Sequence, residues 1–157
     1  MYTDSFLKIS DAQALTATAV GTNAVDLSVD RSISSGEPMC VMFTVGVAAD
    51  QTTGDEDYTF EVEYSSSADQ SAGYVTMGRR LFESGTPAAP AQNADLLVVG
   101  YSFYIPIPPA GTDDSARYLG VRYTLAGTTP AITVDAIVMP MSMVDASETY
   151  ADGFTIV

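Results

Sequence analysis

Alternation of apolar and polar residues across residues 117–139, RYLGVRYTLAGTTPAITVDAIVM, restricts the possible folds of this chain more than any other feature. This period of two predicts half-buried β-strands. The Gly and Pro between the two arms predict a turn. We therefore expect a long β-hairpin, and its apolar face needs a second sheet to cover it. The residues on that face are Leu119, Val121, Tyr123, Leu125, Ile132, Val134, Ala136 and Val138.

Further strands are predicted by the same alternation along the chain. In one of them Glu61 and Glu63 are expected to point to solvent, opposite an apolar face. The prolines that begin at Pro106 are expected to end the strand before them, because proline cannot donate to a sheet ladder. The expected strands are 25–29, 41–47, 58–64, 74–82, 96–105 and a short one at 154–157.

The count of about eight strands, with turn signals between them and no long helix, predicts an all-β antiparallel sandwich. Eight strands in two sheets would suit a jelly roll. At 157 residues and 46% hydrophobic composition, the chain is large enough for one folded domain. Residues 24–157 are expected to form it. Residues 1–23 have the weakest period and are expected to be an N-terminal arm or peripheral strand.

Acidic residues outnumber basic ones by 20 to 6, which gives a net charge of −14. Such a surface repels nucleic acid and anionic membranes, since both are bound mainly through Lys and Arg. No apolar run has the roughly 18 residues of a membrane span, and the N-terminus lacks the pattern of a signal peptide. The charge favours solubility. A basic protein partner remains the alternative interpretation.

The residue types needed for several kinds of catalysis are missing. Without His, the chain cannot form a Ser-His-Asp triad, a Cys-His pair or a His-based zinc site. Gly-rich phosphate loops are also absent from the sequence. The single cysteine, Cys40, lies in an apolar run and is expected to be buried and unreactive. We predict no catalytic residue, no cofactor and no metal site.

Two acidic groups leave alternatives open. Glu61 and Glu63 share a strand face, as paired carboxylates of a glycosidase could, although a solvated face is the favoured interpretation. The acids between Asp50 and Asp57 could hold calcium, but their spacing is not that of an EF-hand, and a solvated loop is favoured.

Two other pairs of residues are candidates for an interface. Arg79 and Arg80 form the only basic pair, which could contact either a neighbouring subunit or an acid of the same chain. Met141 and Met143 lie in a methionine-rich stretch. Methionines adapt to irregular contacts, so an interface is possible here, although core filling is favoured.

The N-terminal residues Tyr2-Thr3-Asp4-Ser5, with the sequence SDAQALTAT at 10–18, resemble the opening of capsid cement (decoration) proteins of tailed bacteriophages, of the Bordetella-phage type. The Gly36-Glu37-Pro38 turn and the strand that follows Arg117 are similar to the same family. The resemblance extends over essentially the full chain, and its motifs are structural rather than chemical.

This resemblance implies a jelly-roll subunit that assembles as a homotrimer on the exterior of the virion. There it would stabilise contacts between subunits of the major capsid protein. The expected contact residues are Arg79, Arg80, Met141 and Met143, together with an N-terminal group, because residues 1–23 have the weakest claim to the core. That group is Tyr2, Phe6, Leu7 and Leu15.

Two other classes of function stay open. A carbohydrate-binding jelly-roll module would need exposed aromatic residues, yet the chain has no Trp. A hydrolase with paired carboxylates is the least favoured interpretation.

Overall fold

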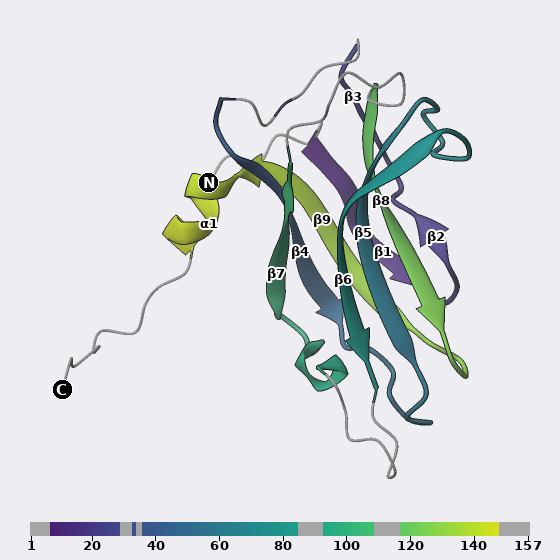
Figure 1. Cartoon of the computed structure of the whole chain (residues 1–157). Coiled ribbons are helices and arrows are strands. Elements are labelled where there is room, and N and C mark those ends of the chain that lie inside the picture. Colours follow the sequence, from purple (N-terminus) through teal and green to yellow (C-terminus); the bar gives the residue numbers. More distant parts are fainter. Residues whose placement is uncertain (1–6, 29–32, 34–35, 85–92, 109–116, 148–157) are drawn as a thin grey trace, which may run out of the picture.

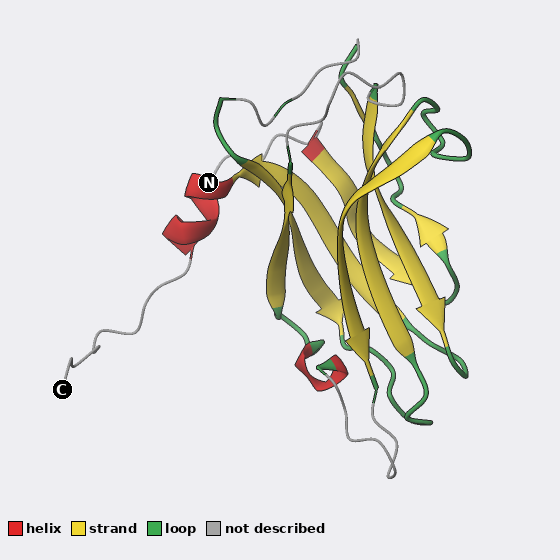
Figure 2. Cartoon of the chain, viewed as in Figure 1, coloured by secondary structure: helices red, strands yellow, loops and turns green. Residues whose placement is uncertain are grey.

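The computed structural model describes residues 7–28, 33, 36–84, 93–108 and 117–147, and these form two antiparallel sheets packed face to face (Figures 1 and 2). One sheet has the strand order β1-β9-β4-β7, formed by Lys8–Leu15, Ile132–Pro140, Met39–Val47 and Ser102–Ile107. The other has the order β2-β8-β5-β6, formed by Ala19–Val20, Tyr118–Ala126, Asp57–Ser65 and Tyr74–Glu83. The short β3, Val25–Asp26, also pairs with β8.

The strand pairing is that of a jelly roll. β1 pairs with β9, β2 with β8, β4 with β7 and β5 with β6, so the partners are nested as in one long folded ribbon. Two further pairings join these pairs into the two sheets, β4 with β9 in one and β5 with β8 in the other. The expected all-β sandwich of about eight strands is confirmed, and its strand order is the one expected of a jelly roll.

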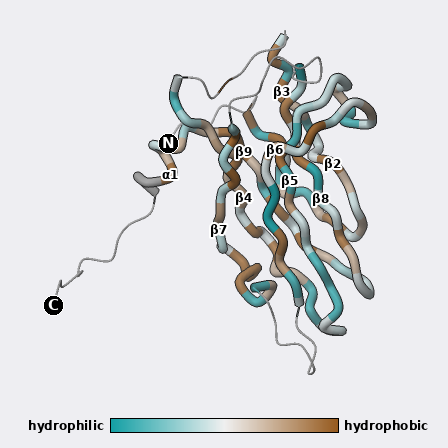
Figure 3. Tube along the Cα trace, viewed as in Figure 1, coloured by the Kyte–Doolittle hydropathy of each residue, from teal (hydrophilic) through white to brown (hydrophobic). Residues whose placement is uncertain are grey.

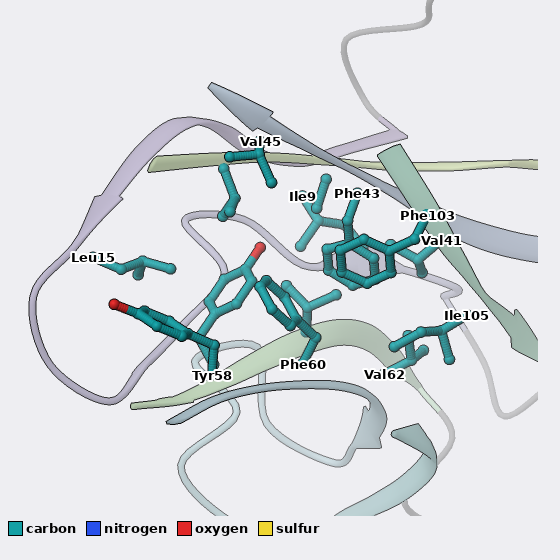
Figure 4. Close-up of a cluster of buried hydrophobic side chains, with 14 of the residues drawn as sticks. Ile9, Leu15, Val41, Phe43, Val45, Tyr58, Phe60, Val62, Phe103 and Ile105 are labelled. Carbon is teal, nitrogen blue, oxygen red and sulfur yellow. The ribbon is translucent and has the colours of Figure 1, made fainter. Parts of the chain in front are cut away.

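The core lies between the sheets and is rich in aromatic rings (Figure 4). Phe60 on β5 is at its centre, because its ring lies 5.0 to 5.7 Å from four others, centroid to centroid. Such edge-to-face contacts add stability beyond that from burial of area. The four neighbouring rings belong to Phe43, Phe82, Phe103 and Tyr123.

The long hairpin predicted at 117–139 is wrong as a pairing, although both of its strands exist. β8 lies in one sheet and β9 in the other, so the loop between them crosses the sandwich. Most of the predicted inward positions are correct, since Leu119, Val121 and Tyr123 are fully buried and so are those of β9, whereas Leu125 is half-buried. Alternation shows which face of a strand is buried, but it does not identify the neighbouring strand.

The strand predicted at 96–105 begins later and ends later than expected. Residues Ala94–Leu96 form a 3₁₀ turn, and a tight turn follows in which Gly100 has a φ of +85°. The regular strand β7 starts at Ser102 and continues through Pro106 to Ile107. Pro106 is accommodated because β7 is an edge strand of its sheet, where a missing donor costs no ladder bond.

Of the two alternatives predicted for residues 1–23, an N-terminal arm or a peripheral strand, residues 8–15 take the second. β1 is the edge strand beside β9, and its Ile9 and Leu15 are 0% and 3% exposed. Ser10 Oγ lies 2.7 Å from Tyr123 Oη, inside the sandwich. Residues 8–15 are therefore part of the core packing. Elsewhere, the strand expected at 25–29 is described only as the two-residue β3, and the strand expected at 154–157 lies outside the described residues.

Within the described residues, no helix has the length and apolar composition needed to cross a membrane. The only described α-helix is α1, Met141–Ser147, which directly follows β9 and lies beside its end (Figure 1).

Candidate interaction surfaces

The outer face of the β1-β9-β4-β7 sheet carries a second apolar cluster, separate from the core. Cys40, Met139 and Val144 are buried there, because α1 packs across the ends of β4 and β9. Met42, Ile137 and Met141 pack around them and are half-buried. In the strand register Met42 lies opposite both Ile137 and Tyr104, and Tyr104 is 38% exposed. We call Met42, Tyr104, Ile137 and Met141 the methionine patch.

Cys40 lies beneath this patch and is inert, as its sequence context predicts. Its side chain is fully buried, and its Sγ donates to the Met139 carbonyl at 3.6 Å. Burial raises the pKa of the Cys40 thiol to about 11, so the thiolate is a minor species at neutral pH.

The methionine patch itself contains no charged side chain, although the chain is strongly acidic. Lys8 lies opposite Ile137 at its border and pairs with Asp11 and Asp135. On the side of α1, Ser142 donates to Glu37 at 2.6 Å. Of the two predicted methionines, Met141 packs on the cluster while Met143 on the same helix is 46% exposed.

The two candidate arginines differ in their contacts. Arg80 extends over the open edge of the core, 4.9 Å from the Phe82 ring centroid and 5.0 Å from that of Phe103, and donates to Tyr101 Oη. Such contacts hold a guanidinium in place. Arg79 points to the other side of β6 and is exposed, and no described carboxylate lies within ion-pair distance of either arginine. The intramolecular acid partner left open for this pair is therefore not found among the described residues.

Of the N-terminal candidates, Tyr2 and Phe6 lie outside the described residues. Leu7 is half-buried and packs against the core. Leu15 must be removed from the candidate interface, because its side chain is 3% exposed and belongs to the core. The apolar positions of β1 that pointed to an interface are instead the positions that attach this edge strand to the sandwich.

The paired carboxylates Glu61 and Glu63 do not share a solvated face. Glu63 is fully buried under the loop that joins β5 to β6, and Arg122 holds it with two hydrogen bonds of 2.9 and 3.0 Å. Burial raises the pKa of Glu63, and the arginine opposes that shift. A sugar could not reach Glu63, so these two residues cannot act as a glycosidase pair.

The loop over Glu63 is held by the same arginine. Arg122 donates to the Gln70 carbonyl at 2.8 Å, and its guanidinium lies 4.2 Å from the centroid of the Tyr74 ring. The Gln70 amide, oriented to satisfy both of its ends, donates to Glu63 and to the Val121 carbonyl. This close fit requires Gly120, because a Cβ there would collide with the Gln70 side chain.

The acidic loop at 50–57 is ordered by its own carboxylates. Glu56 is fully buried and accepts hydrogen bonds from the backbone N–H groups of Thr53, Gly54 and Asp55 and from the Thr53 hydroxyl. Asp50 is bonded by Thr52 and Asp55 by Thr128. Within the described ranges, no three metal-binding side chains gather as a metal site would require. These carboxylates therefore act as acceptors that fix the loop.

The hydrogen bonds of this loop predict a dependence of stability on pH. Burial alone would raise the pKa of Glu56, but its bonds from Thr53 and the neighbouring N–H groups outweigh burial and lower it. Hydrogen bonds also lower the pKa values of Asp50 and Asp55 in the same loop. In the loop between β5 and β6, they lower the pKa of Asp69 to about 2. A lowered pKa stabilises the fold above the ordinary value of 3.8 for Asp or 4.5 for Glu, and this stabilisation is lost as pH falls through the folded value.

We therefore expect the melting temperature to fall steadily as pH is lowered from about 5 towards 2. Glu56→Gln should melt several degrees lower than the original chain at pH 7 and lose less on acidification. The measurement is thermal unfolding by circular dichroism across this pH range. Equal acid sensitivity in both proteins would contradict the role given to Glu56.

The end of the sandwich that contains the acidic loop at 50–57 also has an exposed apolar surface, which sequence patterns did not reveal. Val47, Leu96, Val98 and Val99 are 58%, 40%, 53% and 67% exposed. We call these four residues the valine tip. The run Leu96–Val99 had suggested a strand interior, and the signal against that interpretation was Gly100 directly after it.

Comparison with known families supports a relation to phage proteins. A family model named Bbp16, a name that suggests a Bordetella phage protein, matches residues 9–138, from β1 through most of β9. A search of curated proteins gave no match. Because the matched region covers most of the chain and nearly all of the jelly roll, the chain belongs to the Bbp16 family.

Proposed function

We propose that this protein is a capsid cement protein, which binds the exterior of a phage head as a homotrimer and stabilises contacts between major capsid subunits. Membership of the Bbp16 family is the observation that carries the proposal. The jelly-roll fold and the motifs of the N-terminal segment agree with it. In this role the chain acts by binding alone, with no catalytic step, cofactor, nucleic acid or membrane.

The methionine patch supports a contact between subunits. Copies with a net charge of −14 repel one another, so they can associate only where few carboxylates meet. The patch has no charged side chain and presents methionine, isoleucine and tyrosine, which suit the centre of an interface. A trimer has threefold symmetry, so the patch of one subunit would meet a different surface of the next.

Arg79 is a suitable residue on such a second surface. It is an exposed cation without a described acid partner, so a carboxylate of a neighbouring subunit would pair with it. Arg80 is less suited, because its guanidinium already stacks on core rings.

If the protein is a trimer, its mass in solution should be three times the subunit mass of 16.5 kDa. Light scattering after size exclusion measures this mass. Arg79→Glu should shift this mass towards the monomer, since the new carboxylate meets an acidic neighbour. Arg79→Lys is the control and should remain trimeric. If Arg79→Glu stays trimeric at low salt, Arg79 does not lie in the contact.

The carbohydrate-binding alternative has one favourable observation, which is that Tyr74 and Tyr104 are 49% and 38% exposed. The two rings belong to different sheets, and the Tyr74 ring is already stacked on Arg122. They therefore offer no shared platform for a sugar. A glycan screen would revive this alternative if it gave binding that was lost in Tyr104→Ala.

A further inference from the structure

We propose that the valine tip is the part of the protein that docks on the capsid shell. Its receptor would be an apolar depression on the major capsid protein, bordered by Lys and Arg side chains. The proposal rests on the proposed function and adds to it the end of the jelly roll that faces the shell and the chemistry of its partner. The N-terminal residues remain a separate prediction for this contact.

The four residues of the tip are brought together by backbone hydrogen bonds. The segment before β7, residues 97–100, runs beside the end of β4. Gly100 N donates to the Val45 carbonyl at 2.8 Å, and Ala49 N donates to the Leu97 carbonyl at 3.0 Å. Val47 lies between these two points on β4 and is set outward by a bulge in its pairing with β9. Leu96, Val98 and Val99 come from the adjoining turn, which is the brown segment next to the start of β7 in Figure 3.

The backbone geometry of this turn exposes the side chains of Val98 and Val99 to solvent. Tyr101 N donates to the Val98 carbonyl at 3.0 Å, which closes a four-residue turn with Val99 and Gly100 at its corners. The φ of +85° at Gly100 is suited to glycine, and Leu97 on the inner side is fully buried and anchors the turn. Side chains at the corners of such a turn point outward. Three exposed apolar side chains lie within four residues here, at Leu96, Val98 and Val99, so they form a patch that a partner can bury.

Acidic residues border the apolar centre. The described segments that form this end, 47–57, 93–101 and 126–131, contain Asp50, Asp55, Glu56, Asp57 and Asp95 and no Lys or Arg. Glu56 is buried, whereas Asp95 is exposed within the same turn as Leu96. An apolar centre with a polar rim is the usual anatomy of a protein interface. A rim of one sign selects a partner of the opposite sign, which is why the receptor is expected to be basic.

Other occupants of the tip fit less well. In a tip-to-tip contact, a second copy of this chain would place its own acidic rim against the first, and carboxylates would then face carboxylates. An anionic lipid surface is repelled for the same reason. The methionine patch is better suited to contact between copies, because Lys8 at its border pairs with the two nearby carboxylates of Asp11 and Asp135.

The test compares the binding of purified variants to phage heads that lack this protein. Val98→Ser with Val99→Ser should weaken binding on the order of 100-fold, because two valines lose the free energy of burial at the contact. The control is Val75→Ser, the same type of substitution at a 41% exposed valine on β6, and it should bind as the original chain does. Because all three valines are exposed, the variants should keep the original melting temperature within about 2 °C.

Salt dependence tests the acidic rim. Binding of the original chain should weaken as salt is raised, and binding of Asp95→Asn should weaken less over the same range of salt. A second readout needs no variant. Amide hydrogen exchange of the original chain on heads should slow at residues 93–101, where the Val98 N–H donates to the Leu96 carbonyl at 2.7 Å.

The outcomes separate the two proposals. If the original chain binds heads and the double serine variant binds equally well, docking through the tip is wrong while the cement function stands. Salt-independent binding, or an Asp95→Asn variant with the original salt dependence, would overturn the basic receptor. If the original chain does not bind heads at any concentration, the cement function fails and the tip loses its proposed partner.

Discussion

Replacing Arg122 with alanine is expected to lower the free energy of unfolding by about 3 kcal/mol, because the change leaves a buried carboxylate without its cation. Glu63 is fully buried, and Arg122 supplies two of its hydrogen bonds. The same change removes the donor to the Gln70 carbonyl, so the loop over β5 and β8 loses an anchor. For a chain of this length, the melting temperature should fall by about 6 to 12 °C.

The matched control is Arg117→Ala, which also removes an arginine from an ion pair, here with Asp26. Both side chains of that pair are about half exposed, so this variant should lose far less than Arg122→Ala. Glu63→Gln with Arg122→Ala should lose less than the sum of the two single changes, since each single change leaves its partner uncompensated. Urea unfolding gives all four values. Equal losses for Arg117→Ala and Arg122→Ala would contradict the buried pair.

Phe60→Ala is expected to cost about 4 kcal/mol, because it removes the ring around which the core aromatics pack and leaves a cavity. Phe60 is 1% exposed and contacts rings from both sheets, including Phe43 and Phe103 on one side and Tyr123 on its own sheet. The loss should therefore weaken the contact between the sheets as a whole. Equilibrium unfolding in urea measures it.

Two comparisons sharpen this result. Phe60→Leu should lose clearly less than Phe60→Ala, since leucine fills part of the volume. Val75→Ala, on the exposed part of β6, should lose little. If Phe60→Ala lost no more than Val75→Ala, the ring could not lie at the centre of the core.

Sequence periodicity predicted most of the fold because each long strand has one face in a single core. The alternating positions of β5, β8 and β9 were assigned correctly for that reason, as at Phe60, Val121 and Val134. What periodicity cannot convey is which strands are neighbours. β8 and β9 follow each other in the chain and yet lie in opposite sheets, since a strand with one apolar face fits either sheet of a sandwich equally well.

The errors at Glu63 and Leu15 have a common cause. Glu63 was expected on a solvated face, but the loop with Gln70 covers that face and Arg122 compensates its charge. Leu15 was expected at a surface because its segment lacks a clear period, but pairing with β9 brings it into the core. In both cases a contact between residues distant in sequence decides whether the side chain is buried. A local sequence pattern cannot predict such a contact.

The candidate surfaces were predicted in part. Methionine content pointed to Met141, which lies in the methionine patch, but its companions Met42, Tyr104 and Ile137 come from three different strands. The valine tip was hidden inside an apolar run that looked like a strand. Only the turn at Gly100 and the bulge before Val47 place those side chains in solvent.

Binding to phage heads tests the central claim most directly. Purified protein is added in increasing amounts to heads that lack it, the heads are sedimented, and the bound protein is quantified. The cement function predicts that protein sediments with the heads and saturates at a fixed, repeating number of copies per shell, in multiples of three. Protein that stays in the supernatant at every concentration, while its fold is intact by circular dichroism, would contradict the claim.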